Sequence, residues 1–299
     1  MQKSIWLGTL LAVMSLACAE AANSSLPGAT QRALRQSHVL VIGGSGRNGS
    51  AIVAALEAAG AHPAALTRDV AKARAKLGEH QWLQGDVTRP ATLDAAFKGM
   101  DVVIDAAATR DIEGPNGTAA VDRDGARNVV AAARRAHVNR LLIITGMAVG
   151  NLPPNSPPIM VKVLGAKRDA ERLFAGSGID YVILRPTGIL ERPAGVYALK
   201  LSDPAKYHAA PEEFMMRAPS AEELKAGPPK GTVSLADLAL VIAFAAVDKS
   251  AANKTVVITQ LQPPSSARDD WARQLSAISA VKASEACKDA ETAALACGR

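Results

Sequence analysis

The chain has 299 residues, of which 48% are hydrophobic and 21% charged, a composition that supports a sizeable core and excludes wholesale disorder. Its net charge of +6 forms no Lys/Arg block and only 3% of the residues are aromatic, so a nucleic-acid partner is not expected. The five His and three Cys show no ligand spacing, which predicts that there is no metal site.

The first residues have the pattern of a secretory signal peptide. Lys3 precedes an apolar stretch from Ile5 to Ala17, and small residues follow as far as Ala22. This stretch is shorter than the roughly 20 residues that a membrane-spanning helix needs. We therefore predict a cleaved signal at 1–22, a periplasmic or secreted protein, and no stable membrane insertion after cleavage. An uncleaved N-terminal membrane anchor is the alternative. Residues 23–37 are predicted to be a linker.

The next segment is the most informative part of the chain. An apolar run, Val39–Ile42, is followed by a glycine-rich turn and an amphipathic segment, Ala51–Ala59. The turn consists of Gly43, Gly44, Ser45, Gly46, Arg47, Asn48 and Gly49. In a strand–turn–helix unit, such glycines permit a sharp turn, close approach of the backbone to a diphosphate, and close packing of helix on strand. We therefore expect all seven residues to bind a dinucleotide, with a purely structural turn as the alternative.

Short β-rich runs then alternate with longer helical segments. Further strands are predicted at Pro63–Thr67, Trp82–Gln84, Val102–Ala106, Leu141–Thr145, Tyr181–Leu184 and Thr255–Thr259. Further helices are predicted at Asp69–Leu77, Leu93–Phe97, Val121–Ala136, Val161–Phe174 and Ala236–Val247. Nearly all-apolar strands suit a parallel sheet covered by helices on both faces. The pattern predicts an α/β, doubly wound, parallel-sheet Rossmann domain over 38–260.

Two charged residues follow the second predicted strand. Arg68 is the residue type that favours a ribose 2′-phosphate, and Arg47 in the glycine turn is expected to clamp that phosphate from the other side. The cofactor is therefore predicted to be NADP(H) rather than NAD(H). Alternatively, Arg68 pairs with Asp69, or Asp69 itself binds the ribose.

A proline-rich, irregular stretch lies in the C-terminal half. In open α/β sheets, ligands bind beyond the carboxyl ends of the strands, and the region of about 187–232 follows such an end. We expect it to form a small substrate lobe, with a helical tail at 261–299. A disulfide between Cys287 and Cys297 would need a break in that helix, because ten residues of helix span about 15 Å. Two unpaired thiols are the alternative.

Several motifs in one order resemble the short-chain dehydrogenase/reductase superfamily, in its atypical, NmrA-like, NAD(P)H-binding branch. They are GGSGRNG at Gly43–Gly49, GDVT at Gly85–Thr88, DAAA at Asp105–Ala108, VDRDGARNVVAAA at Val121–Ala133, KRDAERLFAGSGIDYVILRP at Lys167–Pro186 and SLADLA at Ser234–Ala239. The resemblance implies that Asp86 and Val87 border the adenine. It also implies that Ala106 and Ala107 line the ribose, and that Pro186 approaches the nicotinamide.

The resemblance also points to a catalytic region with an unusual residue. Reductases of this superfamily usually pair a Tyr with a Lys four residues later. Here the Lys position corresponds to Lys167, and Val163 occupies the Tyr position. Thr145 corresponds to the usual Ser, whereas Tyr181 is expected to be a core residue. We predict that Lys167 binds the ribose and acts as a general base or orienting group; the alternative is a surface ion pair with Glu171.

These expectations lead to two functional hypotheses. The first is an NAD(P)H-dependent reductase or isomerase of a small, apolar carbonyl, quinone or enone substrate, acting as a monomer or homodimer. The second is a non-catalytic NADPH-binding sensor or assembly factor. The two differ in whether Lys167 is required for turnover.

Overall fold

The computed structural model describes residues 26–150, 152, 155–195, 198–207, 231–261 and 270–281. The predicted signal peptide and the Cys287–Cys297 pair lie outside these residues. The strands are β1 (Val39–Ile42), β2 (Ala64–Thr67), β3 (Gln81–Gln84), β4 (Val102–Asp105), β5 (Arg140–Ile144), β6 (Asp180–Pro186), β7 (Gly188–Leu190), β8 (Leu199–Ser202), β9 (Thr232–Ser234) and β10 (Lys254–Gln260). Every strand predicted from the sequence is present, with ends that shift by a few residues.

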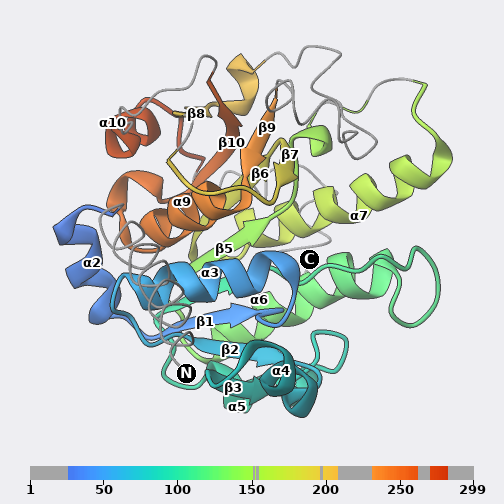
Figure 1. Cartoon of the computed structure of the whole chain (residues 1–299). Coiled ribbons are helices and arrows are strands. Elements are labelled where there is room, and N and C mark those ends of the chain that lie inside the picture. The colour runs from blue at the N-terminus through green and yellow to red at the C-terminus, as the bar shows by residue number, and fades with distance from the viewer. Residues whose placement is uncertain are drawn as a thin grey trace, which may run out of the picture.

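Eight of these strands form one sheet in the order β3-β2-β1-β4-β5-β6-β10-β8. All neighbouring strands are parallel except β10 and β8, which pair antiparallel. The strand order reverses on either side of β1, which places the carboxyl ends of β1 and β4 at a switch point where α/β sheets bind ligands. The sheet therefore has the doubly wound Rossmann architecture that the sequence predicts (Figure 1).

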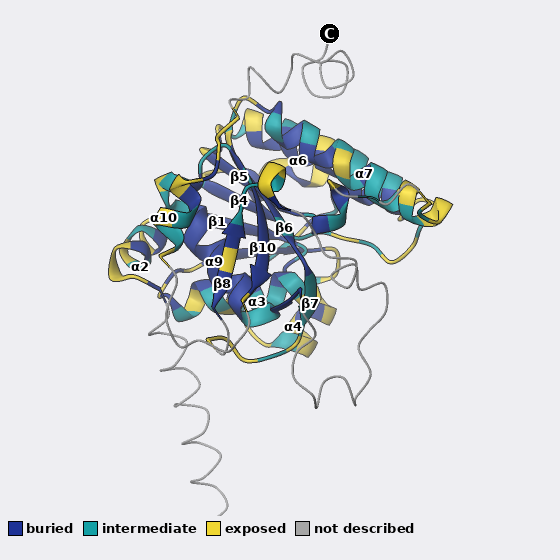
Figure 2. Cartoon of the chain, turned by 90° about the horizontal axis from the view of Figure 1, so that it is seen from above, coloured by how far each residue is buried: buried dark blue, intermediate teal, exposed yellow. Residues whose placement is uncertain are grey.

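Helices cover both faces of the sheet. The α-helices are α2 (Gly28–Arg35), α3 (Arg47–Ala58), α4 (Val70–Leu77), α5 (Asp94–Phe97), α6 (Gly125–Arg135), α7 (Pro158–Ala175), α9 (Leu235–Val247) and α10 (Trp271–Ser276). Short 3-10 turns are η1 (Pro90–Thr92), η3 (Met147–Val149), η4 (Pro204–Lys206) and η6 (Lys249–Ala251), and η2 (Ala119–Asp124) is a π-helix that leads into α6. Figure 2 shows α6 and α7 along one face and α3 and α9 along the other.

The core has two halves because successive side chains of a strand point to opposite faces. On β1, Val39 and Val41 pack in the cluster that contains α3 and α9 side chains, and Leu40 and Ile42 pack in the cluster that contains α6 and α7 side chains. Helix α9 is buried almost throughout, which explains why every residue of it except Asp237 is apolar. None of the helices in the described ranges is long and apolar enough to cross a membrane.

One segment differs from its prediction. Residues 28–35 form α2 instead of part of an extended linker, and Leu34 is completely buried in the core cluster. The helix was not predicted because only two of its residues, Thr30 and Leu34, are buried, which leaves little apolar periodicity in the sequence. The segment therefore belongs to the folded domain.

The predicted substrate lobe is described in part. Strands β7 and β9 form a separate two-stranded parallel sheet, and β8 adds to the edge of the main sheet. Tyr207 packs with Met147 and Val257 in a small apolar cluster. The helical tail is described as far as residue 281 and contains α10.

Candidate nucleotide-binding site

The glycine turn joins β1 to α3 with very little space between them. Gly43 has a φ of +71°, which L side chains rarely adopt, and an added Cβ would lie 3.0 Å from the Ala106 carbonyl oxygen. A Cβ on Gly49 would lie 2.1 Å from the Gly43 carbonyl oxygen. The backbone N–H of Gly46 donates to that same oxygen at 2.9 Å. Only glycine at these two positions permits this approach of helix to strand.

Helix α3 begins directly at the turn, with Gly46 as its N-cap. The N–H groups of Arg47 and Asn48 are in the first turn, where an α-helix offers no internal acceptor. A helix N-terminus also carries a partial positive charge, so a diphosphate is a suitable ligand there. The geometry of the turn is thus compatible with the dinucleotide that the sequence predicts.

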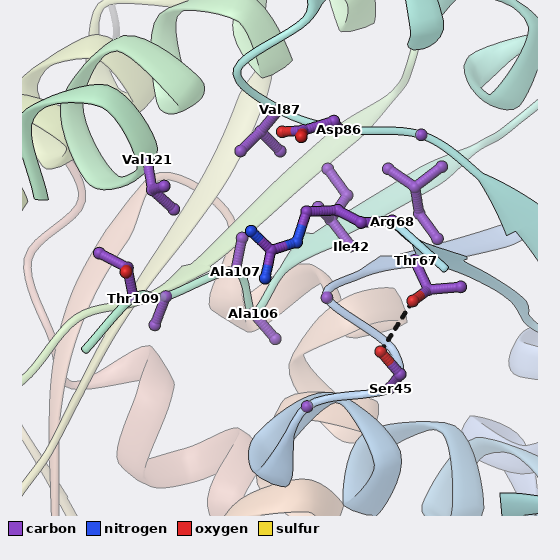
Figure 3. A pocket seen from close by; sticks show the side chains of 15 residues that line it. Ile42, Ser45, Thr67, Arg68, Asp86, Val87, Ala106, Ala107, Thr109 and Val121 are labelled. Atoms are coloured by element: carbon purple, nitrogen blue, oxygen red, sulfur yellow. Dashed lines mark hydrogen bonds between the residues drawn. The ribbon is translucent and has the colours of Figure 1, made fainter. Parts of the chain in front are cut away.

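A pocket opens at this turn, between the carboxyl ends of β1, β2 and β4 (Figure 3). It is lined by Ile42, Gly43, Ser45, Gly46, Leu66, Thr67, Arg68, Gly85, Asp86, Val87, Ala106, Ala107, Ala108, Thr109 and Val121. Eight of these were predicted from the sequence, and most of the others are their immediate neighbours. Thr67 and Val121 were not predicted to bind the cofactor. The Thr67 hydroxyl lies 2.8 Å from that of Ser45, and Val121 comes from η2.

Arg68 is exposed and extends across the mouth of the pocket toward Ala107 and Thr109 (Figure 3). Within the described residues it forms no ion pair with a carboxylate. The alternative partner, Asp69, instead caps α4 by accepting a hydrogen bond from the Lys72 N–H at 2.9 Å. The guanidinium of Arg68 is therefore available to an anionic ligand.

Arg47 does not form the other side of a clamp with Arg68. Its Nε donates to Glu191 Oε1 and its Nη2 donates to the Ile189 carbonyl oxygen, each at 3.0 Å. Its side chain is directed to β7 and does not line the pocket. The predicted two-sided clamp is absent from this structure because Glu191 and the Ile189 carbonyl oxygen accept hydrogen bonds from Arg47. These acceptors are too far from Arg47 in the sequence to be predicted from it.

The turn after β3 forms another wall of the pocket. Asp86 accepts hydrogen bonds from the N–H and the hydroxyl of Thr88, at 2.9 and 2.8 Å. The Asn128 side chain of α6 donates to the Val87 carbonyl oxygen at 2.8 Å. These contacts fix Asp86 and Val87 in the pocket wall, where the resemblance expects the adenine to be bordered.

Lys167 lies on α7 and forms an ion pair with a residue of another element. Its Nζ donates to Asp122 Oδ1 of η2 at 2.8 Å, and the two side chains are 19% and 5% exposed. The expected alternative pair with Glu171 is not formed. Lys167 does not line the pocket, and its partner Asp122 directly follows the lining residue Val121.

A third ionisable group, Asp105, interacts electrostatically with Lys167 and Asp122. Asp105, the last residue of β4, is 5% exposed and accepts a hydrogen bond from the Ala107 N–H at 3.0 Å. Burial raises the pKa of Asp105 to about 7, and the negative charge of Asp122 contributes in the same direction. Asp105 therefore holds a proton up to nearly neutral pH, directly behind the pocket residues Ala106 and Ala107.

Thr145 also has an internal partner. Its hydroxyl donates to Glu171 Oε1 at 2.5 Å. Arg185 of β6 binds both oxygens of the same carboxylate, at 2.9 and 2.5 Å. Glu171 and Arg185 are 6% and 15% exposed, so this is a buried, bidentate ion pair. No local sequence pattern indicated this network, because its members are far apart in the chain.

The residue at the usual Tyr position of the expected reaction region is not a phenol. Val163 is half-buried on α7, one turn before Lys167. Tyr181 is 2% exposed within β6, and its hydroxyl donates to the Val281 carbonyl oxygen at 2.8 Å. It is a core residue, as expected.

Pro186 ends β6 beside Ile258 and does not line the pocket. In the described part of the chain, no group of three or more His, Cys, Asp or Glu side chains is arranged to hold a metal ion.

The fold and the pocket define a nucleotide-binding α/β protein, and comparison with known families agrees. Residues 43–246 match the family described as NAD(P)H-binding. The chain belongs to this family, whose members resemble the atypical short-chain dehydrogenase/reductases.

Relatives of known sequence are partial matches. The Photosystem II assembly factor Ycf39 of Synechocystis sp. is 29% identical over 169 residues, which are 55% of this chain and 49% of that protein. An uncharacterised chloroplastic protein of Arabidopsis thaliana, At2g34460, is 32% identical over 56% of this chain and 64% of its own length. The chain therefore spans about half to two-thirds of the length of these relatives.

Solved structures share the fold. The oxidoreductase ylbE from Lactococcus lactis superposes with a TM-score of 0.59 at 17% identity, covering 80% of this chain and 95% of that one. A short-chain dehydrogenase/reductase from Veillonella parvula, in complex with NADP, superposes with a TM-score of 0.55 at 14% identity, covering 78% and 99%. At these identities the likeness concerns the fold.

Proposed function

We propose that the chain is an NADP(H)-dependent reductase of a small, apolar carbonyl, quinone or enone substrate. The observation that carries the cofactor assignment is Arg68, whose guanidinium crosses the pocket with no carboxylate partner in the described residues. A guanidinium in that place is suited to the phosphate on the ribose of NADP(H). The diphosphate is assigned to the first-turn amides of α3, and the adenine to Asp86 and Val87.

The roles of the reaction-side residues follow from their contacts. NADP(H), when bound, supplies the hydride. We assign Lys167 to an orienting role rather than to accepting a proton, because its ammonium group already donates to Asp122. Its contact with the ribose hydroxyls rests on the resemblance, since Lys167 does not line the pocket. Thr145 donates to Glu171, so we assign it to supporting the site rather than to proton transfer. Asp105 provides a group that is protonated near neutral pH behind the pocket wall.

The cofactor assignment is tested by Arg68→Gln. Charge-assisted hydrogen bonds are worth about 1.5–3 kcal/mol, so the variant is expected to bind NADP⁺ roughly ten- to a hundred-fold more weakly while its affinity for NAD⁺ changes little. Isothermal titration with both nucleotides measures this difference. Arg74→Gln, on an exposed face of α4, is the matched control. An unchanged preference between the two nucleotides in Arg68→Gln would exclude the assignment.

A second function is favoured by a separate observation. The reaction region has Val163 where a proton-donating Tyr is usual, and Thr145 is bound to Glu171. One relative, Ycf39, is an assembly factor. A non-catalytic NADPH-binding sensor or assembly factor is therefore the second candidate. It is distinguished by a panel of carbonyls, quinones and enones: oxidation of NADPH by wild type but not by Lys167→Ala supports the reductase. Bound but unoxidised NADPH supports the second candidate.

We further propose that the mature protein is exported, on the grounds of the N-terminal sequence from Lys3 to Ala22. Mass spectrometry of the purified protein tests this proposal. A mature N-terminus close to residue 23 is expected, whereas an intact Met1 in the membrane fraction would indicate the anchored alternative.

A further inference from the structure

Arg47 connects two regions that are far apart in the sequence. It is the first residue of α3, directly after the pocket residue Gly46. Its guanidinium donates to the Ile189 carbonyl oxygen of β7 and to the Glu191 carboxylate that follows β7. A single side chain thus joins the start of the nucleotide-binding helix to the small β7–β9 sheet of the substrate lobe.

The same helix start is the place for the diphosphate. A phosphate bound there lies beside the first-turn amides, and Arg47 supplies one of those amides. Guanidinium groups bind phosphate with the same bidentate geometry that they use for carboxylates. Two anions are therefore suited to Arg47: the Glu191 carboxylate and the diphosphate of the cofactor.

The existing contact is weak enough to be exchanged. The Arg47 and Glu191 side chains are 42% and 74% exposed. Exposed ion pairs contribute little to stability because water and salt screen them. By contrast, the pair between Lys167 and Asp122 is 19% and 5% exposed, so it is the less easily exchanged of the two.

We propose that Glu191 and the diphosphate of the bound dinucleotide compete for Arg47, so that cofactor binding releases β7 from the start of α3. The inference rests on the proposed function only in taking a dinucleotide as the ligand. Binding linkage is reciprocal: the factor by which cofactor weakens the Arg47–Glu191 contact is the factor by which that contact weakens cofactor binding. Cofactor binding thereby favours the state in which β7 is released from α3.

The test compares the affinities of wild type and Glu191→Ala for NAD⁺ and NADP⁺ by isothermal titration. Removing the competing carboxylate is expected to tighten binding of both nucleotides by roughly two- to five-fold, as the loss of an exposed ion pair allows. Both are affected because both contain the diphosphate. Glu191→Ala is expected to have no effect in an Arg47→Met background. Glu79→Ala, which removes an equally long exposed pair with Arg74, is the matched control.

Hydrogen exchange provides a second measurement. The amides of β7 (Gly188–Leu190) are expected to exchange faster in ligand-free Glu191→Ala than in wild type, and faster in wild type when NAD⁺ is added. Unchanged or weaker nucleotide binding by Glu191→Ala, or slower β7 exchange with NAD⁺, overturns the proposal. Tightening for NADP⁺ alone also overturns it, because it would assign Arg47 to the ribose 2′-phosphate. Equal tightening for both nucleotides in a protein with no NADP⁺ preference or turnover supports it while refuting the proposed function.

Discussion

The carboxyl edge of the sheet has two parts that use their polar side chains differently. Around β1, β2 and β4, the polar groups surround a pocket, and Arg68 has no carboxylate partner in the described residues. Around β5, β6 and α7, Lys167 is bound to Asp122, and Glu171 holds both Thr145 and Arg185. The part around β1, β2 and β4 is open to a ligand. In the part around β5, β6 and α7, the charged side chains neutralise one another. Under the proposed function, a substrate group must therefore act beside these ion pairs or displace them.

The largest effect is expected from Glu171→Ala, which removes the centre of the neutralised part. Leaving Arg185 buried and uncompensated should lower the free energy of unfolding by about 3–5 kcal/mol. Urea denaturation measures this loss. Glu79→Ala, which breaks an exposed pair, is the control and should cost less than about 1 kcal/mol. A Glu171→Ala variant as stable as wild type would remove the contrast between the two parts.

Asp105 lies where the two parts meet and should make stability depend on pH. Burial raises its pKa to about 7 from 3.8, so the folded state binds this proton more tightly than the unfolded state. The corresponding stability is fully present below pH 3.8 and is lost as pH rises through 7. At about 1.4 kcal/mol per pKa unit, the loss is a few kcal/mol at most.

Asp105→Asn, which is uncharged at every pH, should remove this part of the slope. Urea denaturation between pH 5 and 8 measures it, with the same substitution at the exposed Asp111 as the control. A slope equal to that of wild type in Asp105→Asn would show that Asp105 is ionised in the folded protein throughout this range.

Gly49→Ala tests the part of the sheet edge around β1, where the nucleotide is expected to bind. The added Cβ would overlap the Gly43 carbonyl oxygen, at 2.1 Å, which forces α3 away from β1. We expect a loss of about 1–3 kcal/mol in stability and at least tenfold weaker nucleotide binding, measured by thermal unfolding and titration. Gly165→Ala on α7 meets no atom within 4 Å and should be neutral or stabilising. Normal nucleotide binding by Gly49→Ala would contradict the assigned diphosphate site.

The smallest effect is expected from Asp69→Ala. Loss of the α4 cap should cost about 1 kcal/mol of stability, and the affinity for either nucleotide should stay the same because Asp69 does not line the pocket. A selective loss of NAD⁺ binding would instead show that Asp69 binds the ribose. Titration of the variant with NAD⁺ and NADP⁺ distinguishes these results.

The sequence predicted the sheet well, and eight of the residues expected to bind the cofactor line one pocket, because both signals are local. Apolar runs marked the strands, and the glycine spacing from Gly43 to Gly49 marked the turn that opens the pocket. Helix α2 was missed because a short helix with two inward residues leaves little periodicity.

The partners of the charged side chains were not predictable in the same way. For Lys167, the alternative to ribose binding was a pair with Glu171, four positions later, yet its Nζ donates to Asp122, which is 45 positions earlier. Arg47 binds residues more than 140 positions away. Spacing along one helix predicts only neighbours on that helix, whereas these pairs depend on how elements pack. The predicted roles of Lys167, Thr145 and Pro186 stay predictions.

The π-helical turn at Ala119–Asp124 has a consequence for how this chain tolerates change in length. A π-turn holds more residues per turn than an α-helix does, and each residue of an α-helix advances by about 100°. Deleting one residue between Asp122 and the start of α6 would shorten this turn and rotate Asp122 by about 100° relative to α6, away from Lys167. A change of length at this point should thus alter the orientation of the Asp122 carboxylate more than it alters the fold.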